Sequence, residues 1–382
     1  MPSEHAKLNP SAAERWLNCP GSVALSEQCP PSKDTKYSKE GTRAHSVAEA
    51  KLRAISGEIS TRKMNSLIKK EEPDGEMQEA TDYYRDAVTE IFYSAGDDAE
   101  LLVEQKFSLS KWIPESFGTS DAVVIGGGKI EVIDLKYGKG IRVSAKDNPQ
   151  LRLYGLGAAE LFGGLYDFDT VRMTIIQPRL DHVSTDEIPL ADLIKWADGI
   201  KPTAEKAFNG CEEFASGEWC RFCPAKATCR VRAEANLELE RMKFKEPALL
   251  TNDEIGDVLS RGDRLKAWHK DVEEYVFNRA LEGEPFDGWK LVEGKSNRKI
   301  MDELAAVEKL KEAGIDEALL YKREMYGITQ LEKNVGKKKL AETLGNLIQK
   351  PAGKPTLVPE SDKREAINTA EKAAEDFKEE ES

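Results

Sequence analysis

The clearest chemical signal in the sequence is a carboxylate and an amine two residues apart, Asp134 and Lys136 in IEVIDLKYG. Because side chains alternate along a strand, both would emerge from the same face of a strand predicted there. Two charges among the apolar residues of that strand are costly unless they have partners. Asp121, in FGTSDAVVI, lies at the head of the preceding predicted strand, where a hairpin would bring it alongside Asp134. The sequence therefore predicts a pocket shared by two carboxylates and a lysine.

An isolated Asp-x-Lys triplet has a plainer interpretation, which is a structural ion pair on an exposed sheet face. Here the triplet is accompanied by other polar residues. Gln150 and Tyr154 are four apart on one face of a predicted helix, and Glu104 stands alone among the apolar neighbours of LLVEQKF. His45 lies in an earlier predicted helix, where a lone histidine is usually structural. Tyr154 also has the simpler interpretation of a core aromatic with its hydroxyl at the boundary.

Three thiols lie within ten residues, Cys220, Cys223 and Cys229 in GEWCRFCPAKATCR. Such a cluster in a reducing compartment holds a metal more often than a disulfide, but three thiolates are one short of a tetrahedral set. Cys19, in WLNCPGS, is the obvious fourth ligand. The other two cysteines lack comparable context and are interpreted as ordinary thiols. Cysteine spacing alone leaves iron–sulfur and zinc centres open.

A mixed α–β–β–β–α–β core must position these residues. Alternating polarity predicts strands over 101–109, 119–125 and 129–137, which form a meander, and a further strand over 171–178. Helical spacing predicts helices over 11–18, 41–55, 76–96, 148–162 and 189–214, with Thr42 as the cap of the second. Helices are therefore expected to cover a small sheet.

The composition describes a chain of several structural units with an acidic balance. The 382 residues include 56 lysines and arginines against 69 aspartates and glutamates, a net charge of −13. This balance excludes a uniformly basic nucleic-acid coat, although not a nuclease with a positive cleft. We expect a core over 1–240, a helix-rich extension over 241–350 and an acidic, disordered tail over 351–382. No apolar run is long enough for a membrane span or a secretory signal, so we expect a cytoplasmic protein without a membrane partner.

The polar residues form an ordered series along the chain: His45, Glu104, GTSD ending at Asp121, DLK at 134–136 and QLRLY at 150–154. This series resembles the RecB/AddB-like exonuclease branch of the PD-(D/E)XK nucleases, of phage or prophage type. The resemblance covers residues 11–235. It implies an α/β fold of the restriction-endonuclease type, in which a mixed sheet is flanked by helices, with a metal site at one sheet edge and a helical C-terminal extension.

The resemblance also implies a role for each residue. Three side chains and one carbonyl would bind Mg²⁺ or Mn²⁺: His45, Asp121, Asp134 and Leu135. Lys136 would position the attacking water or stabilise the transition state. Gln150 and Tyr154 would contact the nucleic-acid backbone or brace the metal site. Glu104 would either hold a second metal through water or pair with Lys136.

Members of the same branch hold a [4Fe–4S] cluster with one cysteine before the nuclease core and three after it. Cys19 and the group Cys220, Cys223 and Cys229 match this arrangement, including Pro224 directly after the second clustered cysteine. A cluster here would be structural, because joining Cys19 to Cys220 closes a loop of about two hundred residues and restricts the unfolded chain. Structural Zn²⁺ in the same four thiolates is the alternative.

Three functions are compatible with these residues. The first is a metal-dependent DNA exonuclease that acts on single strands or ends in recombination or repair. The second is a DNA-end-binding accessory protein with little or no cleavage, which recruits a recombinase, an annealing protein or a helicase. The third is a thiolate–metal regulatory protein. The intact set of Asp121, Asp134 and Lys136 favours the first, and the absence of a P-loop means that any helicase is a separate protein.

Overall fold

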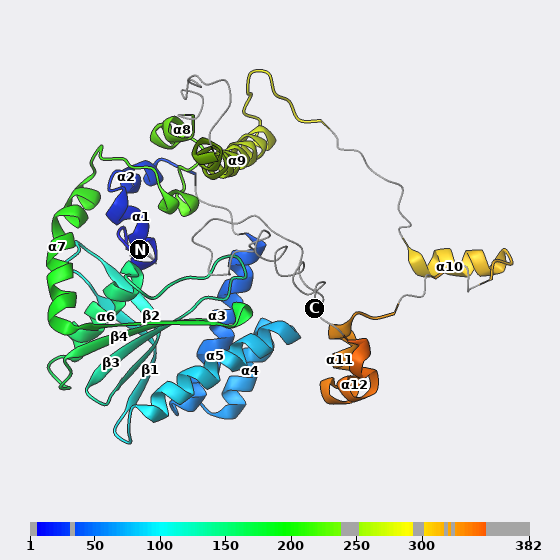
Figure 1. Cartoon of the computed structure of the whole chain (residues 1–382), viewed down its shortest axis with the longest axis horizontal. Helices are drawn as coiled ribbons and strands as arrows, with labels where there is room; N and C mark the ends of the chain where they lie inside the picture. Colours follow the sequence, from blue (N-terminus) through cyan, green and yellow to red (C-terminus); the bar gives the residue numbers. More distant parts are fainter. Residues whose placement is uncertain are drawn as a thin grey trace, which may run out of the picture. The chain divides into compact units, whose positions relative to one another are not determined.

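The structure is a computed structural model of the whole chain, and it describes residues 6–30, 35–237, 252–292, 302–316, 320–321 and 325–348 (Figure 1). The chain divides into two compact units, Met1–Glu282 and Gly283–Ser382. The predicted boundary after residue 240 and the predicted tail over 351–382 lie outside the described residues. All residues singled out for chemistry belong to the first unit.

The first unit is built on a five-stranded mixed sheet. Its strands are β1 (Glu100–Ser108), β2 (Phe117–Gly126), β3 (Lys129–Leu135), β4 (Thr170–Gln177) and β5 (His182–Pro189), in that spatial order. Only the β3–β4 pair is parallel, and the other neighbours are antiparallel. The predicted α/β fold with a mixed sheet flanked by helices is therefore confirmed.

The meander of β1, β2 and β3 follows from alternation and turn chemistry. Gly127 and Gly128, with φ of 59° and 72°, form the two-residue turn between β2 and β3. A hairpin turn with positive φ at both central residues favours glycine, because glycine has no Cβ to clash. On β2, Val123 and Ile125 face one hydrophobic cluster while Ala122 and Val124 face the other.

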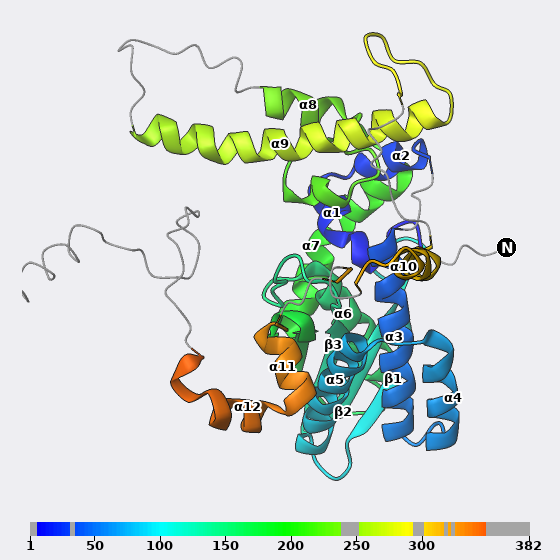
Figure 2. The same cartoon turned by 90° about the vertical axis from the view of Figure 1, so that its right-hand side faces the viewer.

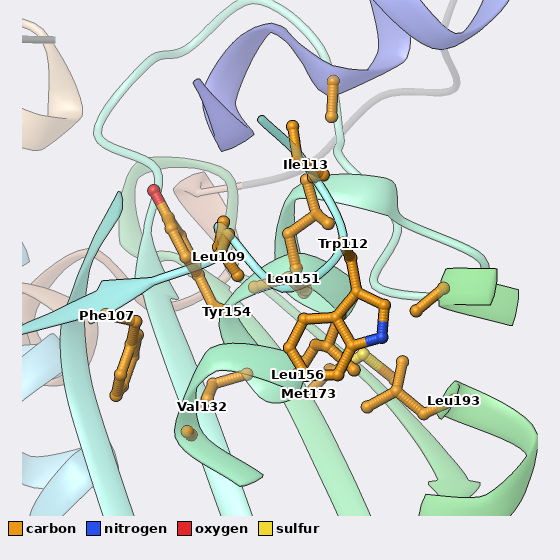
Figure 3. Close-up of a cluster of buried hydrophobic side chains, with 14 of the residues drawn as sticks. Phe107, Leu109, Trp112, Ile113, Val132, Leu151, Tyr154, Leu156, Met173 and Leu193 are labelled. Carbon is orange, nitrogen blue, oxygen red and sulfur yellow. The ribbon is translucent and has the colours of Figure 1, made fainter. Parts of the chain in front are cut away.

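One face of the sheet is covered mainly by α6 (Pro149–Phe162) and α7 (Leu190–Asn209) (Figure 1). Helix α6 begins at Asn148, whose side chain accepts the Leu151 N–H, and it is the crossover between the parallel strands. Figure 3 shows the core at this face, with Leu151, Leu156 and Tyr154 of α6 among residues of the sheet.

The opposite face is covered by α3 (Lys36–Ile55) and α5 (Gly75–Ser94), with α4 (Thr61–Glu71) packed on α3. The prediction that Thr42 caps the first of these helices is wrong. Helix α3 begins earlier, where Thr35 and Ser38 form a reciprocal capping box. Thr42 instead donates its hydroxyl to the Ser38 carbonyl inside the helix.

Two other sequence-based predictions need correction. Strand β5 was not predicted, because its polar sequence alternates between half-buried and exposed residues at the end of the sheet order. The helix predicted over 189–214 ends at Asn209, since Gly210 adopts a φ of 84° that turns the chain away. The predicted strands over 101–109, 119–125, 129–137 and 171–178 correspond to β1 to β4.

The remaining helices are short, apart from α9. In the first unit they are η1 (Pro10–Ala12), α1 (Ala13–Asn18), α2 (Ser22–Glu27), η2 (Pro178–Leu180), η3 (Glu218–Phe222), α8 (Arg230–Leu237) and α9 (Asn252–Leu281). The second unit contains α10 (Glu303–Glu312), α11 (Ile328–Val335), α12 (Lys337–Leu344) and η6 (Gly345–Leu347). Within the described ranges, none of the helices has the length and apolar character needed to cross a membrane.

The close approach of α6 to the sheet leads to a stability prediction. A Cβ at Gly157 would lie 2.5 Å from the Phe107 Cβ, whereas a Cβ at Gly199 of α7 would meet no atom within 4 Å. We expect Gly157→Ala to lower the free energy of unfolding, since overpacking costs about 1–3 kcal/mol. Gly199→Ala should raise it by roughly 0.5–1 kcal/mol through helix propensity. Urea unfolding of both variants measures the difference, and equal shifts would contradict the close packing.

Candidate functional site

Three potential metal ligands meet where α3 approaches β1 and β2. One side-chain ligand atom each of His45, Glu104 and Asp121 lies within 4.8 Å of the other two. His45 Nδ1 is 3.1 Å from Asp121 Oδ1, and Asp121 Oδ2 accepts the Leu135 N–H at 2.7 Å. We call these residues the His45–Glu104–Asp121 cluster. The predicted ligand role of the Leu135 carbonyl remains a prediction.

Glu104 reaches this cluster through a distorted backbone. Its φ of 52° is unusual for a residue other than glycine, and the β1–β2 register continues on both sides of it, at Val103↔Ala122 and Gln105↔Ser120. Val103 packs against the α3 side of the sheet, and Phe107 packs against the α6 side. Residues four apart normally share a face, so the distortion at Glu104 reverses the alternation of β1.

Lys136 lies at the centre of a second group, which we call the Lys136 network. Its Nζ is 2.9 Å from Asp134 Oδ2 and donates to Gln150 Oε1 at 3.0 Å. Gln150 Nε2 is 3.0 Å from Asp134 Oδ1 and 3.2 Å from the Tyr154 hydroxyl. The structure brings the residues expected from the sequence into two adjacent groups, in which Asp134 contacts Lys136 and Gln150 while Glu104 joins His45 and Asp121. A pocket shared by two carboxylates and a lysine remains a prediction.

Burial raises the pKa of two carboxyl groups in this region, Glu104 and Asp134. Burial, the Asp121 carboxylate and the Glu49 carboxylate raise the pKa of Glu104 to about 7. Burial also raises the pKa of Asp134, against the opposing charge of Lys136. Carboxylates with raised pKa values close to one another are stabilised by an added cation.

The two basic groups remain protonated in the absence of a metal. Burial disfavours the charge of His45, but attraction to Asp121 and a hydrogen bond that His45 donates to its carboxylate outweigh the burial and raise the pKa of His45 to about 9. Burial likewise opposes the charge of Lys136, and Asp134 outweighs it and raises the Lys136 pKa. Lys136 is therefore a cation that donates hydrogen bonds to Asp134 and Gln150.

Tyr84 of α5 is a polar group near this region that the sequence analysis missed. Its side chain is 1% exposed, and its hydroxyl has no hydrogen-bond partner among the residues that the structure describes. Burial, together with Asp121, Asp134 and Glu104, raises its pKa. One feature of the sequence could have identified Tyr84: it is a tyrosine on the buried face of a predicted amphipathic helix, where its hydroxyl needs a hydrogen-bond partner.

The four predicted cysteine ligands line one small cavity, together with three basic residues: Arg15, Lys226 and Arg232. Cys19 follows α1, Cys220 belongs to η3, and Cys229 precedes α8. None of the six cysteines, all of which lie in the described ranges, forms a disulfide, and burial raises the pKa of Cys223. We call this the cysteine cavity.

Backbone contacts hold the two sides of the cysteine cavity together. The Gly21 N–H donates to the Glu213 carbonyl at 3.0 Å, and the Ala215 N–H donates to Cys19 Sγ at 3.4 Å. A Cβ at Gly21 would lie 2.8 Å from the Cys211 carbonyl oxygen, so the close approach requires glycine. The protein fold itself therefore brings Cys19 beside the later cysteines.

These features define an α/β protein with a carboxylate–histidine–lysine site on a mixed sheet and a separate four-cysteine cavity. The chain belongs to the family described as "Protein of unknown function (DUF2800)", whose family model matches residues 5–365. The match spans both sites, and the description assigns no activity.

Similarity to a solved structure is weak. The structure titled "Crystal structure of SSO0001" has 16% sequence identity to this chain and covers 57% of this chain and 96% of its own. The TM-score is 0.23.

The His45–Glu104–Asp121 cluster predicts Mn²⁺ binding that depends on Asp121. We expect Asp121→Asn to weaken Mn²⁺ binding by at least roughly tenfold, because it removes the charged oxygen between the other two ligands. Glu131→Gln is the matched control, since Glu131 is also a buried carboxylate of the sheet but donates no ligand to the cluster. Titration by Mn²⁺ electron paramagnetic resonance measures both affinities. Equal affinities in the two variants would contradict this site.

Proposed function

We propose that this chain is a metal-dependent DNA nuclease of the PD-(D/E)XK type that hydrolyses phosphodiester bonds on single strands or at DNA ends. The observation that carries the proposal is the meeting of the His45–Glu104–Asp121 cluster with the Lys136 network through Asp121 and Leu135. A ligand set for a hard cation lies beside a half-buried lysine that is held in a fixed position. A bound cation would activate water and neutralise charge at the phosphate, and the lysine would add further positive charge.

The residues present fit a divalent cation. Two carboxylates and one imidazole suit Mn²⁺ or Mg²⁺, with the imidazole better tolerated by Mn²⁺. Asp134 Oδ2 is buried and receives no hydrogen bond of suitable geometry, although it is paired with Lys136. Glu104 and Asp121 would be held together more stably with a cation between them. A bound divalent cation supplies an acidified water and neutralises charge at the reacting phosphate.

The Lys136 network supplies positioning and charge. Lys136 is fixed by Asp134 and Gln150, so its ammonium group is oriented before substrate binds. It would stabilise the negative charge that develops on a phosphoryl oxygen. Tyr154 has its ring in the core and its hydroxyl at the margin of the core residues, beside Gln150 (Figure 3). It would brace Gln150 and thereby Lys136.

We further propose that the cysteine cavity holds a [4Fe–4S] cluster as a structural group. Four thiolates beside Arg15, Lys226 and Arg232 suit a group with net negative charge. Among the described residues, no three of these sulfurs lie within 4.8 Å of one another. A tetrahedral zinc with bonds of about 2.3 Å would need sulfur–sulfur distances of about 3.8 Å. Zinc in the same four thiolates is the alternative, and the iron and zinc content of the purified protein decides between the two.

The catalytic proposal is tested by removing the Lys136 ammonium group. We expect Lys136→Ala to slow cleavage of end-labelled single-stranded DNA by about two to four orders of magnitude, because electrostatic stabilisation is lost. Mn²⁺ affinity and DNA affinity should change little. Lys129→Ala, at the start of the same strand and paired with Glu187, is the control and should keep full activity.

Wild-type protein must first show cleavage that requires Mg²⁺ or Mn²⁺, with single- and double-stranded substrates tested side by side. If no DNA or RNA is cleaved but DNA ends are bound, the alternative of an accessory protein that recruits a recombination partner replaces the nuclease. A Lys136→Ala variant as active as wild type would also refute the role given to Lys136.

The cluster proposal makes a separate prediction for anaerobically purified protein. The protein should be brown, with about four iron and four sulfide per chain. Cys19→Ser should lose the colour as completely as Cys223→Ser, because both thiolates line the cavity. Cys29→Ser is the control and should stay brown, since Cys29 lies outside the cavity lining. Colourless wild-type protein that holds one zinc would refute the iron assignment.

A further inference from the structure

A second pocket, which we call the basic pocket, lies between the cysteine-containing segment and α9. Six of its lining residues are basic: Arg221, Lys226, Arg232, Arg261, Arg264 and Lys270. Only Glu218 and Asp271 supply negative charge. The chain as a whole carries a net charge of −13, so this local excess of positive charge runs against the composition.

Asp271 fixes the architecture of the basic pocket. Its carboxylate pairs with Lys226 at 2.7 Å and with Arg232 at 2.6 Å, which ties α9 to α8 and to the segment that contains the cysteines (Figure 2). Arg232 is 8% exposed, and it also donates to the Lys226 carbonyl at 2.8 Å. Asp271 therefore pairs with Lys226 and Arg232, which join the two sides of the pocket, and it does not neutralise the other cations.

Arg261 of the basic pocket pairs with Asp257 at 2.9 Å, but other cations of the pocket are available to a ligand. Within the described part of the chain, Arg264 and Lys270 make no ion pair, and both are on the pocket-lining surface of α9. Arg221 extends from η3 on the opposite side, beside Phe222. Positive charge from two different segments, spread along a helix, suits a chain of phosphates better than one small anion.

Phe222 adds an aromatic surface beside these charges. Its side chain is 84% exposed, and the Arg221 guanidinium lies 5.6 Å from the centre of its ring. An exposed phenylalanine next to a basic groove is the combination that binds single strands, because unstacked bases stack on the ring while the backbone contacts the cations. Bases in a duplex are already stacked, so this surface favours a single strand.

We propose that the basic pocket binds the phosphodiester backbone of single-stranded DNA, with Phe222 stacking on a base. The pocket is separate from the His45–Glu104–Asp121 cluster and would hold a strand whether or not it is being cleaved. The proposal rests on the proposed nuclease function in one respect only, which is that the bound polyanion is taken to be DNA. Because binding can be measured without cleavage, its failure is distinguishable from failure of the nuclease proposal.

The test is the salt dependence of binding to a fluorescent thymidine oligonucleotide, measured by anisotropy with the full chain in EDTA. Each phosphate contact contributes about 0.7 to the slope of log K against log salt for single strands. Arg264→Gln combined with Lys270→Gln should therefore reduce the slope by about 1.4. Phe222→Ala should weaken binding roughly fivefold or more at all salt concentrations, because stacking is independent of charge.

Lys266→Gln is the matched control. It removes a charge from the same helix, two residues from Arg264, but Lys266 is 83% exposed, pairs with Asp263 and does not line the pocket. Its slope should equal that of wild type, and circular dichroism should show equal helix content in all variants. An unchanged slope in the Arg264→Gln/Lys270→Gln variant, or no binding by wild type in EDTA, would overturn the proposal. Displacement of the oligonucleotide by micromolar ATP would overturn the choice of a strand over a free nucleotide.

Discussion

The Asp121 carboxylate is the contact on which the arrangement of the site depends. One of its oxygens accepts the Leu135 N–H of β3, and the other is 3.1 Å from His45 of α3. Since Leu135 lies between Asp134 and Lys136, the same contact sets the position of the Lys136 network relative to the cluster. A partly buried carboxylate needs hydrogen-bond partners to offset its lost solvation, and here the same partners fix the geometry of the site.

Both sites are formed by segments that are distant in the sequence, and the sheet is what brings them together. The cluster joins α3, β1 and β2, whereas the cysteine cavity joins the chain before the sheet to the chain after it. Asp271 then extends this connection to α9, so the basic pocket depends on the same segment as the cysteine cavity. A substitution of a cysteine should therefore disturb the structure of the basic pocket more than the structure around Asp121.

The sequence predicted side-chain positions correctly where chemically distinctive residues followed the regular spacing of a strand or a helix. Period two placed Asp134 and Lys136 on one face, and the spacing of four placed Gln150 beside Tyr154, with both contacts present in the structure. The left-handed backbone of Glu104 left no trace in the sequence, because the distortion is imposed by the sheet around it. Strand β5 was not predicted because its sequence is polar. Tyr84 was not predicted as a site residue because its position among apolar neighbours is typical of an ordinary core residue.

The contact between the Ala215 N–H and Cys19 Sγ spans 196 residues, which has a consequence for folding kinetics. Contacts of such large sequence separation pay a high loop-closure entropy and form after local structure has appeared. The helices and the β2–β3 hairpin can form early, but the cysteine cavity is complete only when the sheet and its covering helices have assembled. An inorganic group would therefore be acquired late in folding. Chains still being synthesised would therefore expose the Cys19 thiol before Cys220, Cys223 and Cys229 have been made.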